Sequence, residues 1–302
     1  MKKLVIDTDP GVDDALAIIY ASQKTEIEAI TTVCGNVGQS QALRNANFLR
    51  ELLDLETEVC RGSEKPIERD LDKPSSHGKA GLGNSTPRKD YERSSGEAVE
   101  RIVSMADPDR ELVALGPLTN ICKAVKREPG ILTEYGSFTL MGGAIRTAGN
   151  INRVAEYNFW ADPEAADKTL RDSGYSRIVP VNLCRKTCLD LEFMSELPQE
   201  LREISEPYIR YYRQKKNKKG GVMYDPLTVG LALNPELGAR ERLDIRVETR
   251  GKYTRGMAVT EQRDSEKEEN CEVFTGAETD KIQGDFQDCL KSASEDFNKS
   301  IK

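Results

Sequence analysis

The sequence lacks the features typical of nucleic-acid-binding and membrane proteins. Its 302 residues include 44 Lys and Arg against 51 Asp and Glu, a formal charge of −7. This argues against nucleic acid as a partner, because phosphate binding requires basic surfaces. No apolar run approaches membrane-spanning length, so we expect no membrane partner. The chain also begins without a signal-peptide pattern, and we therefore expect a cytoplasmic protein.

Histidine is nearly absent, and the cysteines show no metal-binding spacing. The chain has 1 histidine, His77, and 7 cysteines without a CxxC pair. Cys184 and Cys188 lie close together, but no histidine stands near them to complete a zinc site. Scattered cysteines in odd number favour reduced structural thiols over disulfides.

Apolar runs alternate with amphipathic stretches along most of the chain. Strands are predicted at 4–7, 28–33, 58–60, 112–115, 138–141 and 177–181, and helices at 15–21, 41–53, 96–105, 119–126 and 163–172. This alternation predicts an α/β fold with an open, mostly parallel sheet flanked by helices. Ligands bind such sheets beyond the carboxyl ends of the strands. No repeat or low-complexity linker divides the chain, so we expect a single domain over residues 1–302.

Three stretches depart from this alternation. Residues 62–95 are rich in Gly, Pro, Ser and charge, as is typical of an active-site lid. The basic run Lys215–Gly221 is better explained as a solvated mobile loop than as a binding site. After Leu237, β-rich segments at 243–248, 256–260 and 272–275 precede a helix near 279–292. They predict a small C-terminal β-hairpin region appended to the same domain.

Four carboxylates follow the first predicted strand. Asp7 and Asp9 project the same way at its end, and Asp13 and Asp14 stand where a helix begins after the Pro10-Gly11 turn. Such closely spaced acids repel one another at neutral pH unless a cation is bound or some stay protonated. All-oxygen ligation of this density suits Ca²⁺ or Mg²⁺. The alternative is a solvated acidic turn whose acids complement the helix dipole.

Other polar groups follow the later strands. Asn36 can reach a ligand above the sheet, and glycines around His77 indicate close backbone approach, although turn and structural roles also explain both. The carbonyl of Leu115 can complete a metal shell. Asp225 is either a helix N-cap or a further carboxylate at the metal. The predicted loop above the sheet carries polar groups suited to sugar hydroxyls, namely Asn150, Glu156 and Asn158.

Five motifs, in this order, resemble the inosine–uridine-preferring nucleoside hydrolases. They are Asp7-Thr-Asp-Pro-Gly-Val-Asp-Asp14, Gly116-Pro-Leu-Thr-Asn120, Met141-Gly-Gly143, Glu156-Tyr-Asn158 and Asp162-Pro-Glu-Ala-Ala166, and residues 247–257 are also similar. The resemblance implies an open α/β sheet with Ca²⁺ at the carboxyl ends of its strands. It implies hydrolysis of the N-glycosidic bond of ribonucleosides to ribose and free base. We expect a homodimer or homotetramer.

The resemblance also implies a role for each residue. The metal ligands would be Asp9, Asp14, Asp225 and the Leu115 carbonyl. Asp9 would in addition be the general base for a calcium-bound water. The ribose-binding residues would be Asp13, Asn150, Glu156 and Asn158. Met141 would line the sugar pocket, with Asn36 and His77 near the base or the outer shell of the metal.

The chain departs from the family at two places. The usual His-Asp-Pro motif is Tyr224-Asp225-Pro226 here, and residues 181–187 depart from the usual Asp-Val-Thr-His wording. The family histidine is held to protonate the departing base. Tyr224 therefore becomes the candidate donor, with another group or water as the alternative. The base preference stays open.

Two further functions remain as alternatives. A non-catalytic, calcium-dependent nucleoside- or ribose-binding protein would keep every ligand and would explain Tyr224. A Mg²⁺-dependent aspartyl-phosphate phosphatase also begins with Asp-x-Asp after its first strand. The phosphatase alternative is weaker, because it leaves several polar residues unexplained, namely Asp13, Asp14, Glu156, Asn158 and Asp225.

Overall fold

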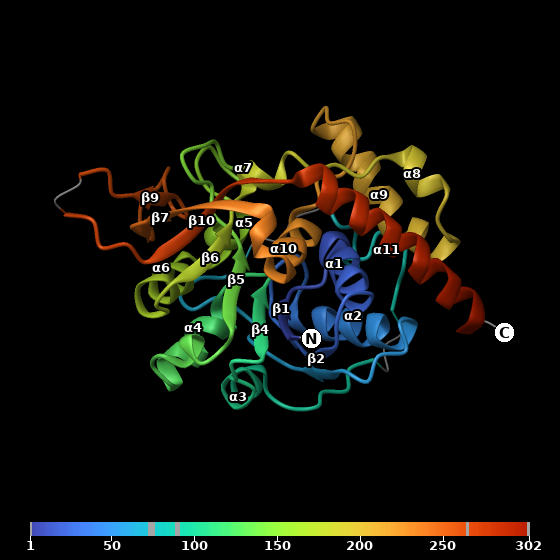
Figure 1. The fold of residues 1–302 in the computed structure, drawn as a ribbon, viewed down its shortest axis with the longest axis horizontal. Helices are drawn as coiled ribbons and strands as arrows, with labels where there is room; N and C mark the ends of the chain where they lie inside the picture. The colour runs from blue at the N-terminus through green and yellow to red at the C-terminus, as the bar shows by residue number, and fades with distance from the viewer. Residues whose placement is uncertain (1, 72–75, 88–90, 264–265, 301–302) are drawn as a thin grey trace.

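The computed structural model describes residues 2–71, 76–87, 91–263 and 266–300, and a single large sheet runs through its centre (Figure 1). The sheet has eight strands in the order β3-β2-β1-β4-β5-β6-β10-β7, and all neighbours are parallel except β10 and β7. The strands are β1 (Lys3–Thr8), β2 (Ile27–Thr32), β3 (Glu58–Cys60), β4 (Arg110–Ala114), β5 (Ser137–Met141), β6 (Ser176–Val179), β7 (Gly238–Leu243) and β10 (Cys271–Ala277).

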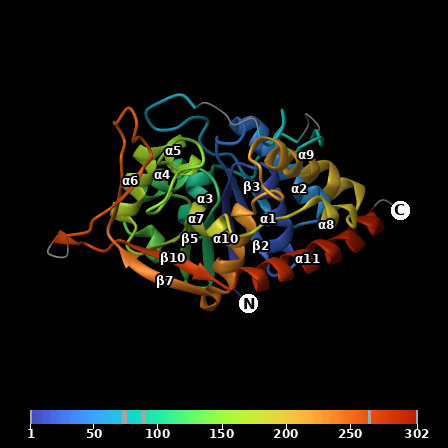
Figure 2. The same cartoon turned by 90° about the horizontal axis from the view of Figure 1, so that it is seen from above.

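Helices cover both faces of the sheet. The longer ones are α1 (Val12–Ser22), α2 (Gln39–Leu52), α3 (Ala98–Ser104), α4 (Thr119–Arg127), α6 (Pro163–Asp172), α9 (Gln199–Lys215), α10 (Tyr224–Leu233) and α11 (Thr279–Ser300). The short ones are α5 (Tyr157–Ala161), α7 (Val181–Cys184) and α8 (Leu191–Ser195), with 3₁₀ turns at Ile131–Thr133 and Pro235–Leu237. Figure 2 shows α11 running along one side of the molecule, where it packs on α1 and α10.

The central strand β1 shows why the predicted strands are continuous apolar runs in the sequence. Leu4 and Ile6 are buried in one core cluster with α1, α9, α10 and α11. Val5, which points the other way, is buried in a second cluster with α3, α4 and α6. A strand covered on both faces needs apolar side chains at successive positions. The predicted α/β class with a mostly parallel sheet is confirmed.

The C-terminal β segments divide between two sheets. β8 (Ile245–Val247) and β9 (Ala258–Thr260) pair antiparallel and form the predicted small hairpin. β10 instead pairs parallel to β6 and antiparallel to β7, within the main sheet. Our assignment of the segment 272–275 to the appended hairpin region was therefore wrong. The free edge of β6 presents backbone N–H and C=O groups, and β10 pairs with them.

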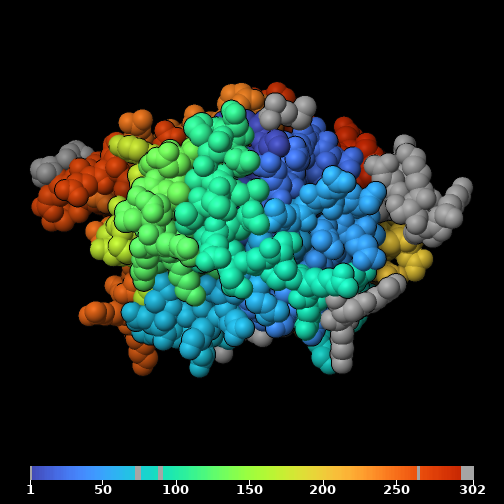
Figure 3. Space-filling view, turned by 90° about the horizontal axis from the view of Figure 1, so that it is seen from below, coloured from blue at the N-terminus to red at the C-terminus, as the bar shows by residue number. Residues whose placement is uncertain are grey.

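The connection between β3 and α3 was the candidate lid. Its described parts run over the surface of the molecule (Figure 3). Ser76 and His77 from this connection reach the cavity described below, whereas positions 72–75 and 88–90 lie outside the described residues. No helix within the described ranges is long and apolar enough to cross a membrane.

Candidate active site

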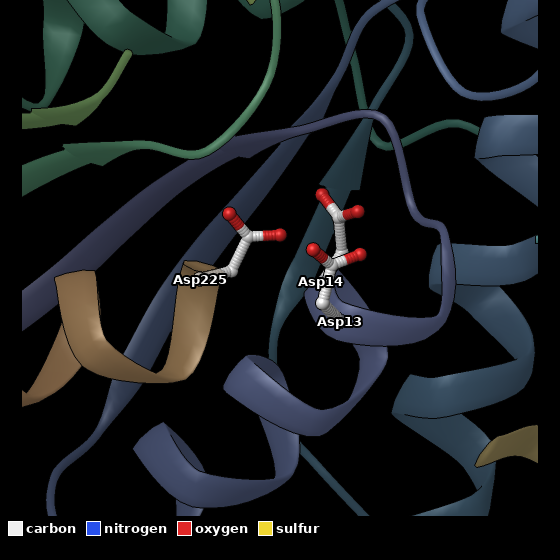
Figure 4. A group of neighbouring side chains, drawn as sticks. All are labelled: Asp13, Asp14 and Asp225. Atoms are coloured by element: carbon white, nitrogen blue, oxygen red, sulfur yellow. The ribbon is translucent and has the colours of Figure 1, made fainter. Parts of the chain in front are cut away.

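Three buried carboxylates meet beyond the carboxyl end of β1. Asp13 and Asp14 lie in the first turn of α1, and Asp225 lies in the first turn of α10, with its carboxylate pointing toward the other two (Figure 4). One oxygen atom from each lies within 4.8 Å of the others. Burial, and then repulsion between these carboxylates, raises the pKa of Asp13 and Asp225 well above the usual value. This is a concentrated all-oxygen donor set.

The turn before α1 holds Asp14 in place. The Thr8 hydroxyl donates to Asp14 Oδ1, and the backbone N–H of Gly11 donates to Oδ2 at 2.9 Å. The Asn36 side chain donates to the same Oδ2 at 3.0 Å. A Cβ at position 11 would lie 2.6 Å from His77 Nδ1, so the turn requires glycine there. Asp14 thus both faces the carboxylate group and fixes the start of the helix.

Asp9 lies apart from this closest group of three. Its side chain is fully buried, and its Oδ2 accepts a hydrogen bond from the Asn36 backbone N–H. Its Oδ1 has no hydrogen-bond partner among the described residues. Two glycines make room for the carboxylate, because a Cβ at Gly35 would lie 1.8 Å from Oδ2 and one at Gly116 would lie 2.7 Å from Oδ1. Burial and repulsion from Asp14 raise the pKa of Asp9 well above its usual value.

A cavity of about 280 Å³ opens above these carboxylates. All predicted site residues except Asp9 and Asp14 line it, and those two accept hydrogen bonds from Asn36, which does line it. The predicted residues in its wall are Asp13, Asn36, His77, Leu115, Met141, Asn150, Glu156, Asn158, Tyr224 and Asp225. Its volume lies near the lower end of the range for small-molecule sites, about 300 Å³.

Glu156 and Asn158 are held by the backbone around the cavity. The Glu156 carboxylate accepts N–H groups of Asn158 at 2.8 Å and Gly143 at 2.9 Å, so it caps α5. Burial raises the pKa of Glu156 to about 7, although these hydrogen bonds lower it. The Asn158 side chain donates to the carbonyls of Leu115 at 2.7 Å and Met141 at 3.2 Å. The polar loop is therefore preorganised by its own contacts.

Comparison with known proteins settles the family. A family model described as inosine-uridine preferring nucleoside hydrolase matches residues 4–284. The chain belongs to this family. Uridine nucleosidase 1 of Arabidopsis thaliana is 34% identical over 266 residues, which cover 83% of this chain and 79% of that protein. The inosine-uridine preferring nucleoside hydrolase of Crithidia fasciculata is 29% identical over 296 residues, covering 92% of this chain and 93% of the relative.

A solved structure agrees with these sequence comparisons. The purine-preferring ribonucleoside hydrolase from Gardnerella vaginalis aligns with a TM-score of 0.88 at 28% identity, over 97% of this chain and 99% of that chain. The predicted family and fold class are confirmed, and the chain is an enzyme that hydrolyses ribonucleosides.

In this nucleoside hydrolase, Tyr224 occupies the position where the usual His-Asp-Pro motif of the family has histidine. It begins α10, lines the cavity and accepts a hydrogen bond from the Tyr212 hydroxyl at 3.3 Å. Burial, and then the neighbouring Tyr212, raises the pKa of Tyr224 well above its usual value. The phenol therefore keeps its proton at neutral pH and has an O–H group available to donate.

The tyrosines of α9 are site residues that the sequence did not reveal. Tyr208, Tyr211 and Tyr212 line the same cavity as Tyr224. The ring centroids of Tyr208 and Tyr212 lie 4.8 Å apart, and the Tyr208 hydroxyl donates to the Val222 carbonyl at 3.0 Å. Their spacing of three and four residues places them on one helix face, which is the signal that would have identified them.

His77 joins the candidate lid to the start of α1. Its Nδ1 accepts the Val12 backbone N–H at 3.1 Å and lies 3.6 Å from an oxygen of Asp13. Burial lowers the pKa of His77 to about 4, so the ring is neutral at neutral pH. In this nucleoside hydrolase His77 supports the helix that carries two of the carboxylates.

Proposed function

We propose that this enzyme is a calcium-dependent hydrolase of ribonucleoside N-glycosidic bonds in which Asp9 is the general base and Tyr224 the donor on the base side. The observation that carries the proposal is the buried group Asp13, Asp14 and Asp225, of which Asp13 and Asp225 line the same cavity as Tyr224. The experiment is product analysis by chromatography after incubation with purine and pyrimidine ribonucleosides, with Ca²⁺ and with a chelator. Formation of ribose and free base only with Ca²⁺ supports it.

The donor set fits a hard divalent cation. At 4.8 Å, two ionised carboxylates repel by about 3 kcal/mol at an effective dielectric constant of about 20, so three of them favour a bound cation. Oxygen donors without nitrogen or sulfur suit Ca²⁺ or Mg²⁺. The ligands in this proposal are Asp14, Asp225, Asp9 and the Leu115 carbonyl, and Asp13 supplies a further carboxylate. When bound, Ca²⁺ lowers the pKa of a coordinated water and holds sugar hydroxyls.

The residues around the sugar carry out the hydrolysis. Oδ1 of Asp9 takes one proton from the attacking water, whose oxygen bonds to the anomeric carbon. The bond between this carbon and the base nitrogen breaks, and its electron pair leaves with the base. The transition state resembles an oxocarbenium ion, and the surrounding carboxylates stabilise its positive charge. Tyr224 donates a hydrogen bond to the base as negative charge develops on it.

We expect removal of the 2′-hydroxyl to be far more damaging than a change of base. Asn150, Glu156 and Asn158 surround the proposed sugar position, and Asn150 Oδ1 is buried without a partner among the described side chains. A site built to pair hydroxyls rejects analogues that lack them, by about 10⁴-fold in favourable cases. The measurement is kcat/KM for uridine, cytidine and 2′-deoxyuridine. Equal kcat/KM values for uridine and 2′-deoxyuridine would show that these residues do not recognise the 2′-hydroxyl.

Tyr224→Phe tests the donor on the base side, because it removes the hydroxyl and keeps the ring. A hydrogen bond to a charged group is worth about 1.5–3 kcal/mol, so kcat for natural nucleosides should fall about 10–100-fold. Turnover of p-nitrophenyl riboside should stay within about threefold, since its leaving group needs no acid. Wild-type rates on natural nucleosides would show that water or another group is the donor.

The base preference stays open, and the oligomeric state and the cellular location stay predictions. The relatives named above include uridine- and purine-preferring enzymes, so the substrate panel must include both kinds of base. A homodimer or homotetramer is expected, which light scattering after size-exclusion chromatography measures. The cytoplasmic location is likewise a prediction.

A further inference from the structure

The basic run at the end of α9 contributes to the wall of the cavity. Lys216 and Lys218 line the cavity together with the α9 tyrosines and Tyr224, and Arg185 adds a third cation. Lys215 and Lys219, from the same run, are not among the described residues that line it. The sequence favoured a solvated mobile loop here. The lysines are exposed, as a solvated loop requires, but Lys216 and Lys218 also line the cavity.

The backbone of this run is fixed at both ends. The N–H groups of Lys216 and Lys218 both donate to the Tyr212 carbonyl, at 3.1 and 3.2 Å. Between them, Asn217 has a φ of 50°, the left-handed conformation that asparagine accepts at helix ends. Beyond them, Gly221 exchanges two backbone hydrogen bonds of 2.9 Å with Leu189. The two lysines are therefore presented to the cavity by an ordered turn.

Lys216 and Lys218 come from the same segment of the chain as the α9 tyrosines that line the cavity. The polar groups that suit the sugar come from other segments. Asn150, Glu156 and Asn158 come from the loop before α5 and its first turn, and the three carboxylates come from the first turns of α1 and α10. The lysines and tyrosines come from α9 and the turn after it, and aromatic rings stack on planar bases. Positive charge and aromatic rings thus share one part of the wall of a cavity that Asp13, Glu156 and Asp225 also line.

We infer that Lys216 and Lys218 stabilise the negative charge of the departing base, so that this enzyme prefers nucleosides whose base leaves as an anion. The inference rests on the proposed function, because it concerns the same cavity. The electron pair of the broken bond remains on the base, which takes a proton from solvent after release. The lysines keep their protons and act only through charge and hydrogen bonding. They favour the transition state over a neutral substrate, which is the condition for a faster chemical step.

The test compares two double variants of the whole chain. K216Q/K218Q removes the two charges that face the cavity, and K215Q/K219Q removes the same number from the same run as a matched control. The substrates are phenyl ribosides whose phenols range from strongly to weakly acidic, and uridine. In K216Q/K218Q, kcat/KM should fall at least about 10-fold for phenyl riboside and uridine but less than about threefold for p-nitrophenyl riboside. K215Q/K219Q should match the wild type, and both should unfold at the wild-type temperature.

Two outcomes overturn the inference. One is an equal loss, or no loss, across the whole phenol series. The other is that uridine 5′-monophosphate is preferred over uridine and that only its turnover falls in K216Q/K218Q, which assigns the cations to a phosphate group.

A binding measurement separates this inference from the proposed function. Calorimetric titration with 5-nitrouracil, an acidic base, at a pH where it is anionic should show at least about 10-fold weaker binding to K216Q/K218Q than to K215Q/K219Q. Equal binding overturns the inference. This measurement needs no turnover, so an inactive wild type with the expected binding difference would reject the proposed function alone.

Discussion

Asp225→Asn should remove the divalent ion and lower kcat by at least about 10³-fold, because several kcal/mol of transition-state stabilisation depend on the ion. The substitution keeps the shape of the side chain and removes one negative charge from the buried group of three. The measurements are ion content by elemental analysis and kcat on uridine. An unchanged ion content in the variant would reject Asp225 as a ligand.

Thermal unfolding distinguishes a lost ion from a damaged fold. Ca²⁺ at 100 times its dissociation constant adds about 2.7 kcal/mol to the free energy of unfolding, which is about 4 °C for a chain of this length. The wild type should show this gain and Asp225→Asn should not. Without Ca²⁺ the variant should unfold at the higher temperature of the two, because it has lost one repelling carboxylate.

Asp162→Asn is the matched control for this variant. Asp162 and Asp225 each stand before a proline at a helix start, and both are buried. Asp162 caps α6 by accepting the Ala165 N–H at 3.1 Å. Asparagine caps a helix as well as aspartate does, so ion and activity should be retained. Some stability should be lost, because Asp162 Oδ2 also accepts the Ile67 N–H at 3.0 Å and an asparagine NH₂ group in its place cannot accept it. In α10 the N-cap position belongs to Met223, which weighs against a capping role for Asp225.

Apart from α5, whose residues were assigned to a loop, the main strands and helices up to β6 could be predicted, because the local sequence pattern shows which of their residues are buried. Of the later strands, β7 was missed, and β10 was predicted as a strand but assigned to the appended hairpin region. β7 exposes Ala239, Arg240, Glu241 and Arg242 at the edge of the sheet, where charges replace an apolar pattern. The sequence of β10 is typical of a strand, but its partner β6 lies 95 residues earlier, since Cys271 pairs with Ser176, and nothing local specifies that pairing. α9 was missed because Pro207 and many charges interrupt its pattern.

The site was predictable where chemistry is concentrated in one segment. The density of acids after β1 indicated a cation site, and the structure brings Asp225 to it from a distant helix. The structure adds Asp13 to the closest group, whereas Asp9 as a ligand stays a prediction. The sequence alone could not show that Glu156, besides capping α5, accepts the Gly143 N–H, because that contact joins two segments that only the fold brings together. Nor did it separate Lys216 and Lys218 from the other lysines of their run.

Asp9→Asn should lower kcat about 10²–10⁴-fold, the range that general acid–base catalysis contributes. Asp9 Oδ1 is buried without a hydrogen-bond partner in the described structure, so it is free to take a proton, whereas the amide of asparagine cannot. Activation of water is needed whatever the leaving group is. The loss should therefore be as large for p-nitrophenyl riboside as for uridine, unlike the selective loss expected for Tyr224→Phe.

Asp7→Asn is the control on the same strand, and it completes the argument for Asp9. Asp7 is equally buried, and its Oδ2, like Oδ1 of Asp9, has no hydrogen-bond partner among the described residues. Its Oδ1 is held by two side chains, since it accepts the Thr31 hydroxyl at 2.6 Å and the Asn120 amide at 2.8 Å. An asparagine oxygen can accept both bonds, so kcat should stay within about threefold of the wild type while some stability is lost. If Asp9→Asn also keeps kcat within that limit, Asp9 is not the base. If it slows uridine but spares p-nitrophenyl riboside, Asp9 acts on the leaving base and the roles proposed for Asp9 and Tyr224 are wrong.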